Sequence, residues 1–303
     1  MPHPFDRALT EVGGNRGLID VFRRRYLLSL IIRKEVQIRY RGSALGWLWS
    51  YVKPLVQFAV FFVAIGVFLG MNGRVENFPL YLLAGTTLVS LFNEAFMNAT
   101  RSLVDNAALI KKIYLPREMF PVASMLVAAV NTAPQIVVIL IIALVMGWTP
   151  SILGVCAIVF GFAIVAVLAT GLGMLFGAVN VSFRDAQSFV EIIGMCAVWT
   201  SPVMYQWQMV ANSVPGWAFI LYRLNPLTPA VELFHLGLWA PVTTSATGML
   251  PSLWQFAAIG FDMSLYEVAG ALFDGGALVL LEEDDRLDTR RLLELMRREH
   301  IAR

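Results

Sequence analysis

Long apolar stretches separated by short polar turns dominate the pattern of hydrophobic and polar positions along this chain. No Asp, Glu, Lys or Arg occurs between Glu118 and Arg184. Because a helix needs about 20 apolar residues to cross the hydrocarbon core of a bilayer, this stretch is long enough to cross twice. In lipid every backbone polar group must pair within its own segment, and these runs are continuous rather than alternating. The pattern therefore predicts membrane-spanning α-helices.

The predicted fold is an all-α integral membrane protein, a polytopic helix bundle with an interfacial helix at its N-terminal end. Five spans are expected at about residues 54–71, 78–93, 119–147, 152–179 and 189–205. A sixth apolar segment, residues 253–281, is interrupted by Asp262, Glu267 and Asp274. An acidic residue at the centre of a membrane helix costs about 2.5–3.5 kcal/mol, so these three roughly offset the apolar gain and leave the sixth crossing open.

The chain divides into three predicted parts. Residues 1–47 are polar and increasingly basic, and Phe22, Tyr26 and Leu30 form an imperfect apolar stripe. This composition is typical of a helix that lies on the membrane surface, although an ordinary basic flank of the first span explains it as well. Residues 48–252 are expected to form the transmembrane domain, and residues 253–303 an atypical C-terminal segment.

Composition and the placement of basic residues fix the expected location. Hydrophobic residues make up 58% of the chain and charged residues 15%, whereas a soluble domain carries about a quarter charged residues. Lys and Arg gather before the first span, after the second and after the fourth, and are sparse in the other loops. By the positive-inside rule we expect a multi-pass protein of the plasma (inner) membrane with a cytoplasmic N terminus and with residues 206–251 outside.

The sequence contains no cluster of Cys or His residues that would indicate a metal site or redox chemistry. Cys156 and Cys196 both lie within apolar runs and are expected to be small buried hydrophobic residues. The three histidines, His3, His235 and His300, are scattered. No cofactor is expected to bind directly to this chain, and nothing indicates a nucleic-acid partner.

Catalytic machinery is equally hard to find. The chain has no phosphate-binding P-loop, no G-x-S-x-G and no H-E-x-x-H motif. We expect no acidic pair inside the first five spans, with Glu94 near a cytoplasmic end. An ion-coupled pump needs ionisable groups within the membrane, so the pattern indicates energy supplied by another subunit.

Two segments outside the spans suggest interactions, each with a plain structural alternative. Residues 206–251 are rich in aromatic residues and their apolar pieces are too short to cross; they suit an aromatic belt at the outer interface, which physics alone favours, or a gate that stacks on sugar rings. Residues 102–117 contain one and a half turns of amphipathic helix. That helix is either a connector or a docking site for a cytoplasmic partner.

Four segments together resemble the permeases of ABC exporters of the polysaccharide-export class. They are residues 39–55, 110–121, 180–185 and 225–234, in the order that this class shows. The resemblance covers about residues 20–250. It implies a homodimer of six-span permeases bound to two copies of a separate cytoplasmic ATP-binding cassette subunit, which holds the ATP. It also implies a lipid-linked polysaccharide substrate, of O-antigen, galactan or teichoic-acid type.

The resemblance also assigns roles to individual residues. Residues 102–112 would form the helix that couples to the ATPase, through Ser102, Asp105, Asn106, Leu109, Lys111 and Lys112. Basic residues near the first span would meet the pyrophosphate of the substrate or membrane lipid headgroups at the entrance: Arg39, Arg41 and Lys53. The segment 215–234 would form outer gate helices, with sugar contacts expected at Trp207, Trp217, Tyr222 and Trp239.

The C-terminal segment departs from this class. Residues 255–280 and 286–301 resemble a fragment of the adenylation domain of nonribosomal peptide synthetases, including a Phe-Asp-x-Ser motif at Phe261–Ser264. Such a fragment lacks the nucleotide-binding loop and cannot adenylate, so a fusion or gene-model artefact near residues 251–255 is the expected explanation. The alternatives to a working permease are a membrane-bound enzyme of lipid-linked glycan metabolism and a truncated, non-functional permease fusion.

Overall fold

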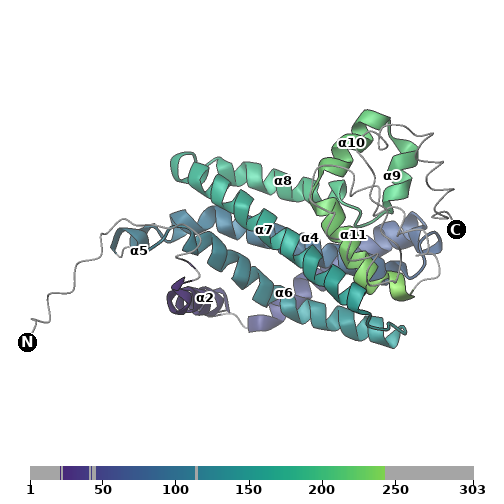
Figure 1. The fold of residues 1–303 in the computed structure, drawn as a ribbon, viewed down its shortest axis with the longest axis horizontal. Coiled ribbons are helices and arrows are strands. Elements are labelled where there is room, and N and C mark those ends of the chain that lie inside the picture. Colours follow the sequence, from purple (N-terminus) through teal and green to yellow (C-terminus); the bar gives the residue numbers. More distant parts are fainter. Residues whose placement is uncertain (1–20, 22, 41, 43–45, 113–114, 243–303) are drawn as a thin grey trace, which may run out of the picture. The chain divides into compact units, whose positions relative to one another are not determined.

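The computed structural model describes residues 21, 23–40, 42, 46–112 and 115–242, and its regular structure there is entirely helical (Figure 1). The predicted all-α class is confirmed for this part of the chain. The chain divides into two units, Met1–Leu253 and Trp254–Arg303, and the second lies wholly outside the described residues. The predicted sixth crossing lies outside them as well. All the described residues belong to the first unit.

Four helices in the described ranges are long and apolar enough to span a membrane. They are α3 with its π-helical continuation η2 (Trp49–Phe61 and Phe62–Phe68), α4 (Phe78–Asp105), α6 (Met119–Val145) and α7 (Ile152–Ser182). The next helix, α8 (Ala186–Thr200), is apolar but has 15 residues. At 1.5 Å per residue it extends about 22 Å, less than a hydrocarbon core of about 30 Å. The fifth crossing therefore stays a prediction.

The second span extends further than the sequence pattern predicted. Its helix α4 continues past Asn93 to Asp105, so the expected loop after Asn93 is wrong. Neither glycine nor proline interrupts this part, and Ala95, Phe96 and Ala99 continue the buried face of the helix. The helix breaks at Asn106 (φ −100°, ψ 14°), and the short helix α5 (Ala107–Lys112) follows. The predicted coupling helix 102–112 is thus two pieces: the last turn of α4 and α5.

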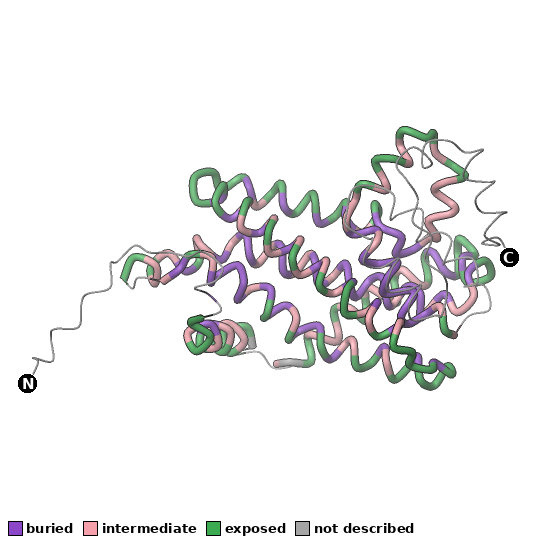
Figure 2. Tube along the Cα trace, in the orientation of Figure 1, coloured by how far each residue is buried: buried purple, intermediate pink, exposed green. Residues whose placement is uncertain are grey.

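Helix α4 is the centre of the bundle. Of the 18 residues that form its apolar stretch, 72% are buried within the protein, whereas 6% of the corresponding stretch of α3–η2 are buried. It packs against α6, α7 and α8 and also against α11 (Leu227–Leu238). Figure 2 shows the buried positions concentrated along α4 and α11, whereas α8 is mostly exposed. The largest enclosed side chains on α4 are aromatic: Phe78, Tyr81, Phe92 and Phe96.

Helix α7 approaches its neighbours through a stripe of small residues. Its buried positions recur every three or four residues, at Gly154, Ala157, Gly161, Val165, Ala169, Gly173, Gly177 and Asn180. A Cβ atom at Gly173 would stand 2.3 Å from the Cβ atom of Ala99 on α4. At Gly161 it would stand 2.8 Å from the carbonyl oxygen of Ala230 on α11. Small residues of this kind let helix backbones meet closely in a membrane, where packing drives association.

Local signals explain where the long helices stop and start between α6 and α7. Gly147, with φ 91°, follows the end of α6 in a left-handed conformation that glycine adopts readily. The N–H of Trp148 then donates to the carbonyl of Ala143 at 2.9 Å, and the N–H of Gly147 to that of Leu144 at 3.1 Å, which closes the helix end. Helix α7 begins after Ser151, whose hydroxyl accepts from the N–H of Gly154 at 3.0 Å.

Three short helices follow α8 in the region 206–251, whose apolar pieces are predicted to be too short to cross. They are α9 (Trp207–Ser213), α10 (Gly216–Leu224) and α11. The first two have no buried residue, which suits an interface, but every residue of α11 except Pro229 is buried. Helix α11 is therefore packed within the protein, whereas α9 and α10 lie at its surface. Helix α11 packs against both α7 and α4, and the small residues of α7 allow the close approach. The indole N–H of Trp148 also donates to the carbonyl of Gly237 at 2.8 Å.

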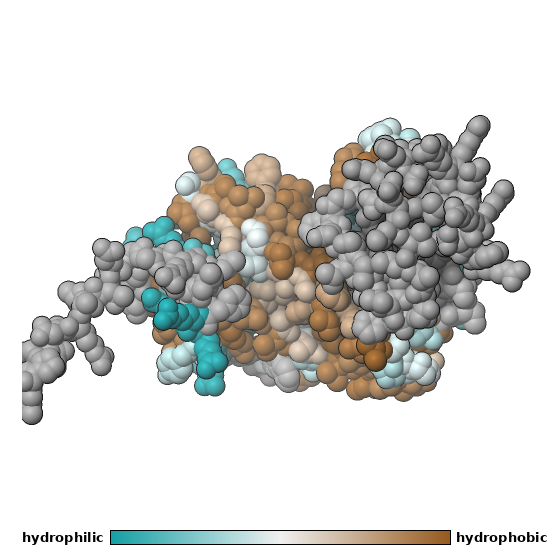
Figure 3. All heavy atoms as spheres, viewed as in Figure 1, coloured by the Kyte–Doolittle hydropathy of each residue, from teal (hydrophilic) through white to brown (hydrophobic). Residues whose placement is uncertain are grey.

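The outside of the bundle has the composition of a membrane protein. Exposed side chains on α6 and α7 include Val137, Ile141, Val159, Val167 and Leu175. Figure 3 shows apolar atoms over the middle of this face, with hydrophilic atoms gathered at the end where α2 (Arg25–Tyr40) and α5 lie. In Figure 1 α2 is seen nearly end-on while α4, α6 and α7 run across the view. An orientation across the spans agrees with the predicted interfacial helix.

Candidate functional site

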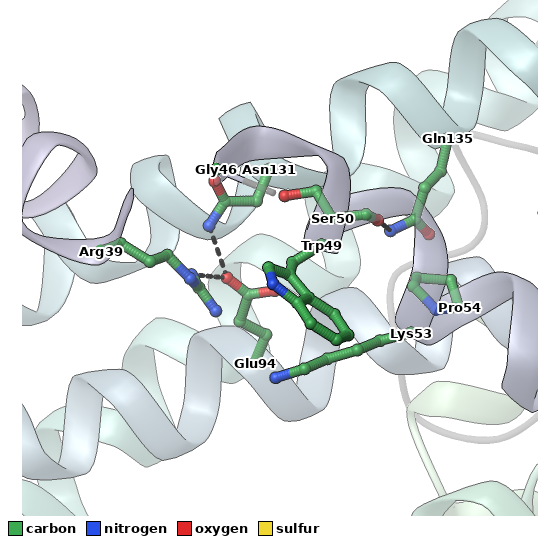
Figure 4. A pocket seen from close by; sticks show the side chains of 9 residues that line it. All are labelled: Arg39, Gly46, Trp49, Ser50, Lys53, Pro54, Glu94, Asn131 and Gln135. Carbon is green, nitrogen blue, oxygen red and sulfur yellow. Dashed lines mark hydrogen bonds and ion pairs between the residues drawn. The ribbon is translucent and has the colours of Figure 1, made fainter. Parts of the chain in front are cut away.

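A polar pocket lies at the N-terminal end of α3, the first candidate span (Figure 4). Its volume is about 400 Å³. It is formed where α2 ends, where the 3-10 turn η1 (Gly46–Leu48) enters α3, and where α4 and α6 pass alongside. The lining residues are Arg39, Gly46, Trp49, Ser50, Lys53, Pro54, Glu94, Asn131 and Gln135. Arg39 and Lys53, both predicted at a substrate entrance, are therefore brought together, and Arg41 lies outside the described residues.

A carboxylate with two donors forms one wall of the pocket. The guanidinium of Arg39 donates to Oε1 of Glu94 in an ion pair. The side-chain amide of Asn131 donates to the same oxygen at 2.7 Å. The pair is only partly enclosed, since the side chains of Arg39 and Glu94 remain 40% and 26% exposed. The Oε1 atom of Glu94 thus links α2, α4 and α6 at the pocket through two hydrogen bonds.

The opposite wall belongs to α3. Figure 4 shows the Lys53 side chain running beside the Trp49 ring, with its ammonium group on the side of Glu94. The amide nitrogen of Gln135 donates to the backbone carbonyl of Ser50 at 3.1 Å, which ties α6 to α3. The amide oxygen of Gln135 is buried without a hydrogen-bond partner in the described structure. The pocket therefore offers two cations, one anion and two side-chain amides.

This combination suits an anionic ligand that also carries hydrogen-bonding groups. A guanidinium presents a planar fork of donors that matches phosphate oxygens, and an ammonium adds a compact charge. Trp49 supplies an apolar face beside them. Sequence reasoning found Arg39 and Lys53 but missed Asn131 and Gln135. Their signal was present, because two amides one helical turn apart stand out in an otherwise apolar span.

The described residues show no pair of carboxylates within the predicted first five spans, but the sequence-based prediction overlooked Glu191, which lies in the predicted fifth span. Glu94 lies well inside α4, because that helix continues to Asp105. Glu191 lies within α8 and pairs with Arg101 of α4 at 2.6 Å. Each carboxylate thus faces an arginine on a neighbouring helix, an arrangement that a linear pattern does not reveal.

The predicted coupling residues divide into an inner and an outer set. Ser102 and Asn106 are buried, and the Ser102 hydroxyl donates to the carbonyl of Ala99 at 2.6 Å. Leu109 is half-buried and packs against a cluster that includes Leu28 and Ile31 of α2. The outer set, Asp105, Lys111 and Lys112, is exposed. Only these three present their side chains to a partner in this conformation.

The predicted outer-gate residues also divide. Trp217 of α10 is 69% exposed. Trp207 and Tyr222 are half-buried and joined through Phe219, with ring centroids 6.4 Å and 6.2 Å away from it. Burial raises the pKa of the Tyr222 hydroxyl well above its ordinary value, with further contributions from nearby Tyr205 and Glu232, so it stays protonated.

Trp239 differs from the other three aromatic residues. It is 1% exposed, and its indole N–H donates to the carbonyl of Glu76 at 2.7 Å. Its ring meets Tyr81 edge-on at 5.1 Å. These are the contacts of a core residue, and Trp239 shares no open surface with Trp217 in the described structure.

Comparison with known proteins adds the family to this geometry. Residues 26–239 match the family described as ABC-2 type transporter. The chain is 32% identical over 209 residues to the O-antigen export system permease protein RfbA of Klebsiella pneumoniae, covering 68% of this chain and 77% of that protein. It is 21% identical over 212 residues to the polysialic acid transport protein KpsM of Escherichia coli, covering 68% and 78%.

The chain belongs to the ABC-2 type transporter family. It is a membrane permease subunit of a transporter and not an enzyme, in agreement with the lack of catalytic motifs. The family match ends at residue 239, so the adenylation-domain resemblance of the C-terminal segment receives no support from it.

Proposed function

We propose that this permease exports a lipid-linked polysaccharide from the cytoplasm across the inner membrane, driven by ATP hydrolysis on a separate subunit. The pocket that joins Arg39 and Lys53 carries the proposal, since it places two cations at the foot of the spans. The named relatives export O-antigen or transport polysialic acid. The substrate is an O-antigen, galactan or teichoic-acid-like glycan whose lipid-linked phosphate enters through this pocket.

The cytoplasmic face is the end of the bundle with α2 and α5. This assignment follows from the basic residues there, since Lys and Arg are retained in the cytoplasm. The ATP-binding cassette subunit docks on the exposed side chains Asp105, Lys111 and Lys112. ATP binds to that partner, and α5 transmits its motion to the spans.

The working unit is a homodimer in which α3–η2 faces the second copy. Four valines on this segment recur at intervals of four, three and four residues and are all exposed: Val56, Val60, Val63 and Val67. Such spacing makes one helix face. In a background with Cys156 and Cys196 replaced by alanine, Val60→Cys forms a cross-linked dimer in native membranes. Failure of Val60→Cys and Val63→Cys to cross-link contradicts this interface.

The outer gate is formed by α9 and α10 at the other end of the spans. The exposed ring of Trp217 and the half-buried pair Trp207 and Tyr222 provide flat faces of the kind that pack against sugar rings. Trp239 is excluded from this role by its enclosure.

Purification with the partner tests the proposal. Co-expressed with its cognate cassette ATPase, the chain gives a stable complex whose ATP hydrolysis rises when lipid-linked glycan is added. Arg39→Gln with Lys53→Gln removes this stimulation, while Arg74→Gln, an exposed basic residue between α3 and α4, keeps it. Complex formation without any response to lipid-linked glycan supports the alternative of a truncated, non-functional permease.

A further inference from the structure

The most informative group that the proposed transport function leaves unused is the carboxylate of Glu94. We propose that Glu94 takes the position of a substrate phosphate in the polar pocket lined by Arg39 and Lys53 (the entrance pocket), and that an incoming phosphate takes Arg39 from it. The inference rests on the proposed function, because it assigns the exchange to the same pocket.

The hydrogen bonds of Glu94 are those that a phosphate oxygen would make. One oxygen, Oε1, accepts from the guanidinium of Arg39 and from the amide of Asn131, the latter at 2.7 Å. The two donors come from different helices and converge on one point at the pocket wall. Convergent charged and neutral donors are what an oxyanion requires.

The exposure of the pair permits exchange. Arg39 and Glu94 are 40% and 26% exposed and face the pocket, whereas the buried pair of Glu232 and His235 in α11 is 3% and 0% exposed. A partly exposed ion pair contributes little to stability, so a ligand with more negative charge can replace it.

The charges explain why exchange is needed. With Glu94 ionised, Arg39 and Lys53 give the lining a formal excess of one positive charge. A diphosphate carries more negative charge than this excess, and it repels the carboxylate. Glu94 therefore swings away as the phosphate binds, and the link between α2 and α4 opens. Binding of a phosphate in the pocket in this way releases α2 from α4. Helix α2 packs against the start of α6 and against α5.

Equilibrium binding of radiolabelled farnesyl diphosphate tests the exchange. The full chain is placed in nanodiscs of phosphatidylcholine, which carry no competing anionic headgroups. Glu94→Gln removes the competing negative charge. We expect this variant to bind the probe roughly two- to fivefold more tightly than the wild type. The control is Glu191→Gln, which removes a comparable carboxylate of α8 that is paired with Arg101 of α4. This variant leaves the affinity unchanged.

Three further results separate the exchange from the pocket itself. Glu94→Asp, one methylene shorter, gives a smaller gain and serves in place of Glu94→Gln if that variant does not fold. Arg39→Gln weakens binding, and Arg39→Gln combined with Glu94→Gln loses the gain. If Glu94→Gln binds no tighter while Arg39→Gln binds more weakly, the exchange is wrong and the entrance pocket stands. If Arg39→Gln and Lys53→Gln both leave binding unchanged, the entrance pocket and the exchange are both wrong.

Discussion

Lys34 of α2 donates a hydrogen bond of 2.7 Å to the side-chain oxygen of Asn106, the residue at which α4 ends and α5 begins. The Asn106 amide in turn donates to the carbonyl of Ser102 at 2.9 Å. Leu28 and Ile31 of α2 lie in one apolar cluster with Met119 and Phe120 of α6, and Leu109 and Ile110 of α5 pack against it. Helix α2 therefore connects the proposed ATPase contact on α5 with the pocket that contains Arg39.

Removing this hydrogen bond tests the connection. Lys34→Met keeps most of the length of the side chain and loses the donor to Asn106, at a cost of about 1 kcal/mol; it also removes the exposed ion pair with Glu35, which contributes little. We expect glycan-stimulated ATP hydrolysis by the complex to fall roughly fivefold, the factor equivalent to that energy. Ser29→Ala, which removes only a bond to the carbonyl of Tyr26 within α2, retains the stimulation. Equal stimulation in Lys34→Met and the wild type would show that α2 transmits nothing.

The exposed face of α5 is tested by reversing its charge. Lys111→Glu with Lys112→Glu changes two exposed side chains without touching the buried Asn106. We expect affinity for the cassette ATPase to fall at least about tenfold, as loss of charge complementarity does at interfaces. Arg74→Glu, exposed between α3 and α4, leaves that affinity unchanged. Titration of the partner against the permease in nanodiscs measures both, and an equal loss in the two variants contradicts docking on α5.

The packing of α7 on α4 predicts different effects for two glycines of one helix. Gly173→Ala brings a methyl group to within 2.3 Å of the Cβ atom of Ala99, and such overpacking costs about 1–3 kcal/mol. At Gly171 nothing lies within 4 Å of an added Cβ, so Gly171→Ala is neutral or slightly stabilising. Thermal unfolding of the purified chain in detergent measures the difference. A melting temperature for Gly173→Ala at or above that of Gly171→Ala refutes the close contact.

The aromatic residues beyond α8 separate into gate and core by experiment. Trp217→Ala alters a side chain that is 69% exposed, so we expect lower glycan export at an unchanged melting temperature. Trp239→Phe removes the buried hydrogen bond from the indole N–H to the carbonyl of Glu76 and costs about 1–3 kcal/mol in stability. Unaltered export by Trp217→Ala would favour the plain aromatic belt over sugar stacking.

The apolar pattern predicted most of the bundle because membrane helices are long and continuous. Four candidate spans appear where expected within the described residues, and α6 and α7 match their predicted ranges closely. The pattern failed where polar residues enter a helix. The stretch after Asn93 contains Asn98, Arg101 and Asp105, polar residues that predict a loop, yet its buried face continues to Ser102.

The candidate site was only half visible in the sequence for a related reason. Arg39 and Lys53 are assigned to the entrance because residues 39–55 resemble the corresponding segment of polysaccharide-export permeases. Glu94, Asn131 and Gln135 reach the pocket from α4 and α6, and their convergence depends on how the helices pack. Burial of α11 likewise depends on the small residues of α7, which meet it from a distant part of the chain.

Movement of lipid-linked glycan across the membrane of proteoliposomes tests the central claim most directly. The vesicles contain the full chain and its cassette ATPase, and a probe for the glycan is added to the leaflet opposite the ATPase. We predict that glycan reaches that leaflet only with ATP and both subunits, and that Arg39→Gln with Lys53→Gln abolishes its appearance while Arg74→Gln does not. Glycan that stays on the ATPase side with the wild-type complex, or that crosses equally well with an ATPase unable to hydrolyse ATP, would contradict the account.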